Sequence, residues 1–137
     1  MSTDLMLYGD IGLDWWSGDG ITDEQVHASL QTLDPSASQH TVHINSVGGR
    51  VDTGLAIMNL LRAHSAQMQA VNPDFKLKTI CEGYAMSIAS VIFMAGDIRT
   101  VALGGVVMIH EAWNGCYGNA AEMRKTCLLY TSPSPRD

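Results

Sequence analysis

The chain has 137 residues, of which 46% are hydrophobic and 16% are charged, and its formal net charge is −6. This length suffices for one domain with its own core and excludes two, and the composition excludes a disordered chain. The eight Lys and Arg residues form no run, which excludes the clustered positive charge that nucleic-acid binding requires.

The first half of the chain predicts two strands, each followed by a helix. An apolar run at 5–8 predicts a buried strand, and residues 9–20 predict a loop. Thr22-Asp-Glu-Gln25 matches a capping box, which marks the start of a helix. The helix has Val26, Leu30 and Leu33 on one face and ends before Pro35.

The second strand is predicted at 41–45, where β-branched residues alternate with others, and 46–49 predict a turn. A second helix is predicted from Asp52 onward, and its buried face is formed by Gly54, Ile57, Met58 and Leu61.

The second half of the chain continues the same alternation. Residues 77–81 predict a strand, 82–86 a turn, and 87–95 a third helix that Gly96 and Asp97 end. Residues 106–109 predict a further strand that ends at His110. Strands that alternate with helices predict an α/β fold of βαβ units, with a mostly parallel sheet and three to four flanking helices.

The sequence offers no membrane segment, disulfide framework or metal site. The N-terminus carries Asp4 and no long apolar stretch, unlike a secretory signal, and the longest apolar run, 88–95, is far below the roughly 20 residues that span a bilayer. Cys81, Cys116 and Cys127 are widely spaced and form no CxxC pair. We therefore expect a cytoplasmic protein that requires no metal and no cofactor.

Three features follow predicted strands, where open α/β sheets place their functional sites. They are the pair Gly48-Gly49, Ser87 at the start of a helix, and His110 directly after a strand. Each has a structural alternative, because glycine pairs form turns, serine caps helices, and a single histidine is usually structural or on the surface. Their joint occurrence favours a functional site at this edge of the sheet, where the amide that follows Ser87 is free to bind an oxyanion.

The same residues carry a resemblance to the ClpP-type serine peptidases. Ile44-Asn-Ser-Val-Gly-Gly-Arg-Val51 with Gly54-Leu-Ala-Ile57 resembles the family segment I-N-S-P-G-G-x-V…G-x-x-I, with Val47 in place of the proline. Gly83-Tyr-Ala-Met-Ser87-Ile-Ala-Ser90 resembles the nucleophile segment, and Val107-Met-Ile-His110-Glu resembles the histidine segment. The three segments occur in the family order, and the resemblance covers about residues 5–125.

The resemblance implies a ClpP/crotonase-like fold, oligomeric rings and hydrolysis of peptide bonds through an acyl-enzyme. It assigns Ser87 as the nucleophile, His110 as its base, and the amides of Gly49 and Ile88 as the oxyanion hole. It further implies that an extended substrate peptide binds along two segments, Arg50-Val51 and Ala112-Trp113. Its implied partners are polypeptide substrates and further copies of the chain, and an ATPase unfoldase or capsid proteins are candidates.

Two more segments are similar, within that family, to the phage head-maturation proteases. They are Tyr8-Gly-Asp-Ile-Gly12 with Trp15-Trp16, and Ala112-Trp113-Asn-Gly115 with Gly118-Asn-Ala-Ala-Glu122. We therefore expect a phage or prophage protein that acts in the host cytoplasm on capsid-related or unfolded chains.

The end of the chain departs from the family. The acidic member of the triad is expected well downstream of His110, and no residue here matches it, so we expect this polypeptide to have little or no peptidase activity. Residues 126–137 resemble translated adapter DNA and contain Pro133 and Pro135. We expect a peptidase domain over 1–125 and a disordered, artefactual tail over 126–137.

Two other functions stay open at this point. A crotonase-type acyl-CoA enzyme shares the fold, and it would be preferred if Ser87 and His110 were out of hydrogen-bonding reach. A non-enzymatic ring-forming or capsid-assembly protein is the other. Trp15, Trp16 and Trp113 could form a ligand platform, although such residues more often pack at a core edge or a subunit contact. His43 is expected to be a structural histidine with its hydrogen bonds satisfied.

Overall fold

A parallel sheet is the centre of this protein. The computed structural model describes residues 1–111 and 118–131, and within 126–131 it describes the backbone only. The described strands pair in the order β1-β2-β3-β4, and β5 pairs with the second half of β3. Every strand pair is parallel. The strands are β1 (Asp4–Tyr8), β2 (Gln39–Ser46), β3 (Lys76–Met86), β4 (Ile98–Val101) and β5 (Val106–Met108).

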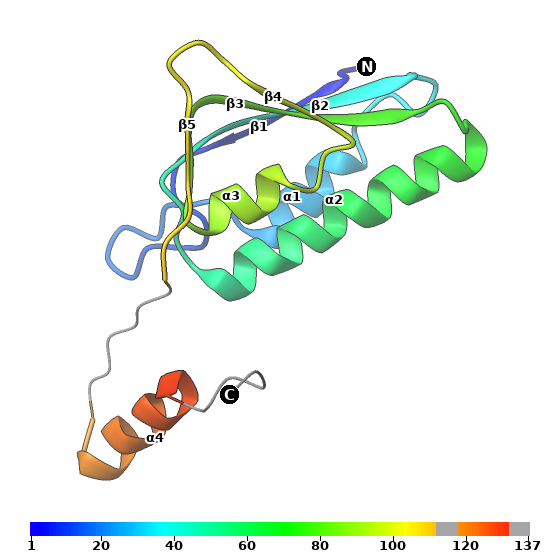
Figure 1. The fold of residues 1–137 in the computed structure, drawn as a ribbon. Helices are drawn as coiled ribbons and strands as arrows, with labels where there is room; N and C mark the ends of the chain where they lie inside the picture. The colour runs from blue at the N-terminus through cyan, green and yellow to red at the C-terminus, as the bar shows by residue number, and fades with distance from the viewer. Residues whose placement is uncertain (112–117, 132–137) are drawn as a thin grey trace.

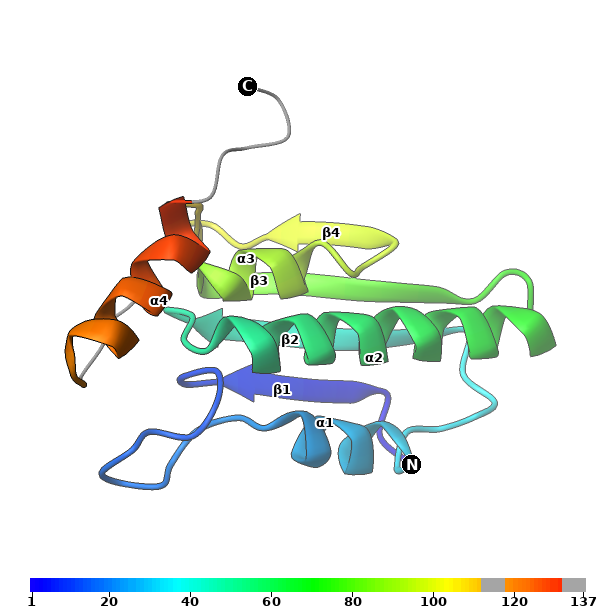
Figure 2. The same cartoon turned by 90° about the horizontal axis from the view of Figure 1, so that it is seen from below.

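Three helices cover one face of this sheet, as Figure 1 shows. They are α1 (Asp23–Leu30), α2 (Val51–Val71) and α3 (Ile88–Phe93). A fourth helix, α4 (Ala120–Thr131), follows residues 112–117. In Figure 2 the carboxyl ends of β1 and β2 point to the side from which the β1–α1 loop protrudes. The expectation of an α/β fold with a mostly parallel sheet and flanking helices is confirmed.

Alternation along the strands builds the core between the sheet and the helices. Leu5 and Leu7 of β1 are buried, while Asp4, Met6 and Tyr8 are exposed. Successive side chains of a strand point to opposite faces, so the buried set is the one that faces the helices. The core on that side includes Val42, Ile44, Ile57, Leu61 and Leu77.

The start of α1 forms as the sequence predicts. The Thr22 hydroxyl accepts a hydrogen bond from the Gln25 amide, and the Gln25 side chain accepts one from the Thr22 amide. This reciprocal pair satisfies two amides that have no partner within the helix. The α-helix ends at Leu30, and Leu33, which the sequence placed on its buried face, is buried just after the following turn, where it forms an isolated bridge with Ser2.

The sequence-based prediction was wrong about residues 82–86, which continue β3 instead of forming a turn. Their partners come from distant parts of the chain, because Ser46 pairs with Ala85, and β5 pairs with the segment from Tyr84 to Met86. Strand β4 was not predicted at all, and all four of its residues are exposed. Its pairing with β3 at 78–81, and not a local hydrophobic pattern, forms it.

Helix α4 continues to Thr131, so it includes the first residues of the segment 126–137 that was expected to be disordered. Residues 132–137 lie outside the described residues. Pro133 and Pro135 come after Thr131 in the sequence, so neither proline interrupts a turn of α4.

Candidate active site

Ser87 connects the end of β3 to the start of α3 with an unusual backbone. Its φ is 53° and its ψ is −127°, and it is the one residue other than glycine with positive φ in the described part of the chain. Such a conformation is costly for a residue with a Cβ atom, and strain of this kind occurs often at functional sites. Ser87 is the N-cap residue of α3, yet its side chain makes no capping hydrogen bond. The structural alternative, a serine that merely caps a helix, is therefore not what is observed.

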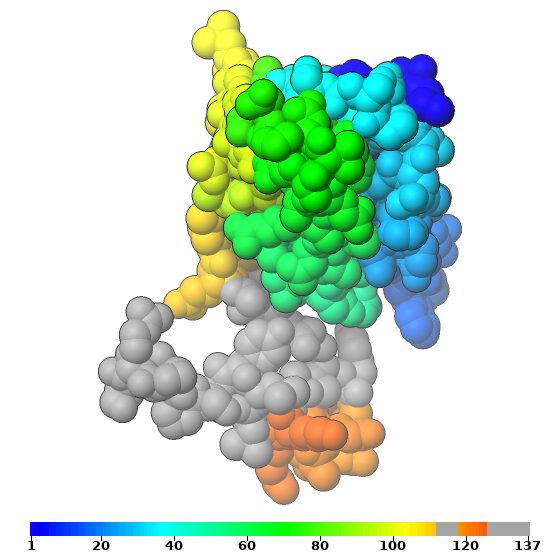
Figure 3. Space-filling view, turned by 90° about the vertical axis from the view of Figure 1, so that its right-hand side faces the viewer, coloured from blue at the N-terminus to red at the C-terminus, as the bar shows by residue number. Residues whose placement is uncertain are grey.

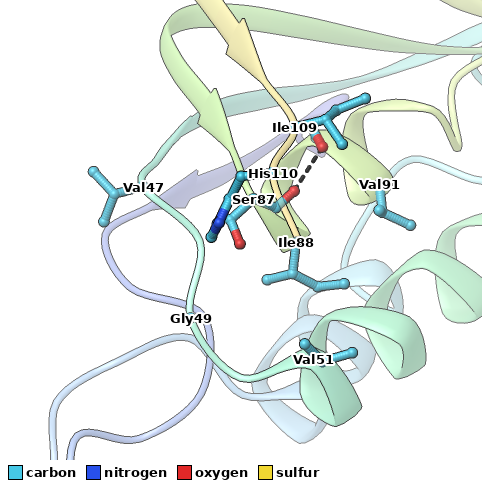
Figure 4. A pocket seen from close by; sticks show the side chains of 9 residues that line it. Val47, Gly49, Val51, Ser87, Ile88, Val91, Ile109 and His110 are labelled. Carbon is cyan, nitrogen blue, oxygen red and sulfur yellow. Dashed lines mark hydrogen bonds between the residues drawn. The ribbon is translucent and has the colours of Figure 1, made fainter. Parts of the chain in front are cut away.

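His110 lies close to Ser87 because β5 is hydrogen-bonded to the nucleophile segment. The Ser87 amide donates to the carbonyl of Met108 over 2.8 Å, and His110 is two residues further along the chain. Two residues span at most about 7 Å, so the imidazole cannot be far from the serine. Ser87 and His110 line the same pocket, and Figure 4 shows both side chains facing it. Among the described residues, no hydrogen bond joins the Ser87 hydroxyl to the His110 ring.

The diglycine bend approaches Ser87 from the other side. A Cβ atom on Gly48 would lie 2.7 Å from the Cβ of Ser87, and one on Gly49 would lie 2.1 Å from the carbonyl oxygen of Ile11. Both glycines have positive φ, 101° and 147°. Only glycine allows this contact, because a side chain at either position would overlap with neighbouring atoms.

The bend leaves amides free for a ligand. The Ile11 amide donates to the Gly48 carbonyl, and the Arg50 amide donates to the Ile11 carbonyl. These two bonds hold the bend against the segment that follows β1. Within the part of the chain that the structure describes, the amides of Gly49 and Ile88 donate no hydrogen bond. Both residues line the pocket that contains Ser87. Two free amides near a serine hydroxyl are the donors that an oxyanion requires.

The pocket has a volume of about 520 Å³ and its side walls are apolar. The uncharged apolar walls come from the diglycine bend, from α2, from α3 and from the segment after β5. They are formed by Val47, Val51, Ile88, Val91 and Ile109. Such a wall favours an apolar group of the ligand, because burial of apolar surface contributes about 25 cal/mol per Å².

The predicted peptide-binding segments divide between two places. Val51 lines the pocket of Ser87, but Arg50 lines a neighbouring pocket. The Arg50 guanidinium donates to the Asp52 carboxylate over 3.2 and 2.6 Å, and this contact holds the pKa of Asp52 below its usual value. Ala112 and Trp113 lie outside the described residues.

Several residues of the recognised segments support the site in ways that the sequence did not indicate. The Asn45 side chain accepts a hydrogen bond from the Tyr84 amide over 3.0 Å, which ties β2 to the half of β3 that leads to Ser87. The Ser46 hydroxyl accepts from the Gly48 amide over 3.1 Å, and the buried Ser90 hydroxyl donates to the Ser87 carbonyl over 2.6 Å. The sequence signal that could have identified these supporting residues is their position, because Asn45 and Ser46 stand just before the glycine pair and Ser90 stands just after Ser87.

His43 belongs to a separate cluster on the sheet face opposite the helices. Its ring nitrogens contact Glu82 over 2.7 Å and Asp4 over 2.9 Å, and the Tyr8 hydroxyl donates to Glu82. Partial burial lowers the pKa of His43, but the two carboxylates outweigh it and raise the pKa overall. The expectation of a satisfied structural histidine is confirmed. Among the described residues, no group of His, Cys, Asp and Glu side chains is arranged to hold a metal ion.

Trp15 and Trp16 do not pack at a core edge. Their side chains are 88% and 90% exposed. No helix in the described part of the chain combines the length and the apolar character needed to cross a bilayer.

Comparison with known proteins gives one consistent result. The sequence model of the Clp protease family matches residues 17–128. ATP-dependent Clp protease proteolytic subunits from Bacteroides fragilis and Deinococcus radiodurans are each 35% identical to the chain, over 99 and 100 residues, or 71% and 70% of its length. Subunit 1 from Shouchella clausii is 33% identical over 114 residues, or 77% of the chain. These matches cover 43%, 45% and 54% of the relatives, so the chain spans about half of their length.

Proposed function

This chain belongs to the Clp protease family, and from that premise we propose that it is the catalytic part of a serine endopeptidase that cleaves peptide bonds through an acyl-enzyme on Ser87. One observation carries the proposal. A serine with φ of 53° and a hydroxyl without a hydrogen-bond partner lines one pocket with a histidine and two free amides. Within the described residues, no other serine combines positive φ with such surroundings.

The proposed mechanism assigns one role to each group. His110 removes the proton of the Ser87 hydroxyl while the oxygen attacks the substrate carbonyl. The negative charge that develops on the carbonyl oxygen is stabilised by the amides of Gly49 and Ile88, and loss of one such donor typically costs about 2.7–4 kcal/mol. His110 then donates its proton to the leaving amine, and water hydrolyses the ester on Ser87.

The strained backbone of Ser87 supports this role. Positive φ turns the residue sharply between the strand and the helix, as in the strand-to-helix turns that expose nucleophiles in other hydrolases. Three contacts hold the turn, namely the Ser87 amide to Met108, the Ser90 hydroxyl to the Ser87 carbonyl, and the close approach of Gly48. The contacts fix the backbone of Ser87 so that its side chain faces the pocket, which is what a nucleophile requires.

Covalent labelling tests the proposal. The purified chain is incubated with a fluorophosphonate probe, and the labelled residue is identified by mass spectrometry. We expect labelling on Ser87 alone, abolished by Ser87→Ala and slowed by His110→Ala, with His27→Ala as the control because His27 is exposed on α1. No described carboxylate is bonded to His110, so we expect labelling about 10⁴-fold slower than in a homologue with a complete triad. Equal labelling of the Ser87→Ala variant would refute the assignment.

The finer assignment concerns substrate and assembly. We propose that the whole protein forms homo-oligomeric rings and acts on capsid-related or unfolded polypeptides during phage head maturation. The support is the resemblance of two segments to that branch of the family. The first is Tyr8–Gly12 together with Trp15-Trp16, and the second lies within 112–122. The relatives are named ATP-dependent, and an ATPase unfoldase is the corresponding candidate partner. Native mass spectrometry tests ring formation, and cleavage of a capsid protein encoded beside the gene tests the substrate.

A further inference from the structure

The loop between β1 and α1 has a defined structure at its tip. We call residues 13–19 the tryptophan loop. The Asp14 amide donates to the Asp19 carbonyl over 2.8 Å, and the Gly18 amide donates to the Asp14 carbonyl over 3.0 Å. The Asp14 carboxylate also accepts from the amides of Trp16 and Ser17, each over 2.9 Å. These bonds close the tip of the loop and fix the backbone from which its side chains project.

Two aromatic side chains are displayed on this loop. Trp15 and Trp16 are almost fully exposed, and the adjacent Leu13 is 53% exposed. Figure 3 shows this part of the chain, in medium blue at the lower right, projecting beyond the body of the domain. An exposed apolar patch on the surface of a protein often marks an interaction site. An indole ring buries a large area in such a contact at low entropic cost. The structured turn therefore presents two unpacked indoles.

The charge of this region defines the chemistry of its partner. Residues 1–49 contain no Lys or Arg, and all eight basic residues lie from Arg50 onward. Three aspartates surround the tryptophans, and the carboxylates of Asp10 and Asp19 have no partner among the described residues. The nearest cation in sequence, Arg50, is paired with Asp52. This surface repels acidic chains and anionic lipids and attracts a positively charged partner.

The tryptophan loop is continuous with the candidate active site. A second pocket, with a volume of about 310 Å³, is lined by Leu13 and Asp14 of the loop and by Val47 and Gly49 of the diglycine bend. Val47 and Gly49 also line the pocket of Ser87. A polypeptide that occupies the Ser87 pocket can therefore continue past the bend and reach the loop without leaving the surface.

We propose that the tryptophan loop is a substrate-binding exosite that recognises a basic segment of the polypeptide to be cleaved. The faces of the indole rings contact the cationic groups of Lys or Arg side chains and pack against their apolar stems. The carboxylates of Asp10 and Asp19 attract the positive charge of the same side chains. This inference rests on the proposed function, because it takes the occupant of the neighbouring pocket to be a peptide substrate.

A binding assay tests the exosite separately from the chemistry. Fluorescein-labelled dodecapeptides of equal apolar content, one with three arginines and one with three glutamates, are titrated against the Ser87→Ala protein, which cannot acylate. We expect the arginine peptide to bind and its Kd to rise at least tenfold in Trp15→Ala/Trp16→Ala. The Asp10→Asn/Asp19→Asn variant should raise the Kd of the arginine peptide about threefold and make its binding less dependent on salt concentration. Leu103→Ala is the matched control, because Leu103 is fully exposed in the turn after β4. Circular dichroism verifies the fold of each variant.

The outcomes separate the alternatives. Equal binding of the arginine peptide by the double tryptophan variant, or equal binding of the glutamate peptide by the wild-type loop, overturns the proposal. Loop-dependent self-association in sedimentation, or loop-dependent binding to phosphatidylcholine vesicles, with no peptide binding, also overturns it in favour of another occupant. Absence of Ser87 labelling in the wild type, together with intact loop-dependent peptide binding, contradicts the proposed chemistry and supports only the recognition of a basic peptide by the loop.

Discussion

Replacement of the candidate nucleophile by glycine should stabilise the protein. Ser87 has φ of 53°, which costs a residue with a Cβ atom about 1–3 kcal/mol. Glycine adopts this conformation without strain but loses about 0.4–1 kcal/mol through the greater freedom of the unfolded chain. The Ser87 hydroxyl has no hydrogen bond to lose among the described residues. The free energy of unfolding of Ser87→Gly should therefore rise, by about 1.3 kcal/mol at the middle of both ranges and by about 2.6 kcal/mol at most.

Urea denaturation followed by circular dichroism measures this change. Ser87→Ala is the matched control, since alanine also lacks the hydroxyl but keeps the Cβ atom and hence the strain. We expect its midpoint to stay close to that of the wild type, and the thermal midpoint of Ser87→Gly to rise by about 2–6 °C. Both variants should be inactive. A Ser87→Gly protein no more stable than Ser87→Ala would refute the argument that strain is stored at this residue.

Two further predictions concern the support of the site and the opposite face of the sheet. Gly54→Ala should lower the free energy of unfolding by about 1–3 kcal/mol and slow the labelling of Ser87, because its Cβ would lie 2.1 Å from the Ile88 side chain; an unchanged urea midpoint and labelling rate would contradict this contact. The His43 cluster should stabilise the fold most between about pH 4.5 and 6.5, the usual pKa values of its glutamate and histidine. Because folding raises the pKa of His43, the stability that His43 contributes is lost as pH rises through its folded pKa. Because folding lowers the pKa values of Asp4 and Glu82, the stability that these carboxylates contribute is lost as pH falls through their folded pKa values. Thermal unfolding across pH 4–9 should show this maximum in the wild type and a flatter profile in His43→Gln.

The local pattern of the sequence was sufficient where local forces decide the structure. The capping box at Thr22 places the start of α1, an apolar run places β1, and alternation of β-branched residues places β2, because these signals depend on neighbouring residues alone. The second half of β3 and the whole of β4 were missed for the opposite reason. They are strands because distant segments pair with them, and sequence windows do not include those partners.

For the candidate site too, the sequence and the tertiary structure supplied different information. The sequence by itself determined the chemical groups, since Gly48-Gly49, Ser87 and His110 stand in recognisable segments at the ends of strands. Only the tertiary structure decided that the backbone of Ser87 is strained, that Gly48 packs against it, and that the tryptophan loop lines a pocket next to that of Ser87. These features arise from packing between segments far apart in the chain, and a one-dimensional pattern carries no information on the distance between them.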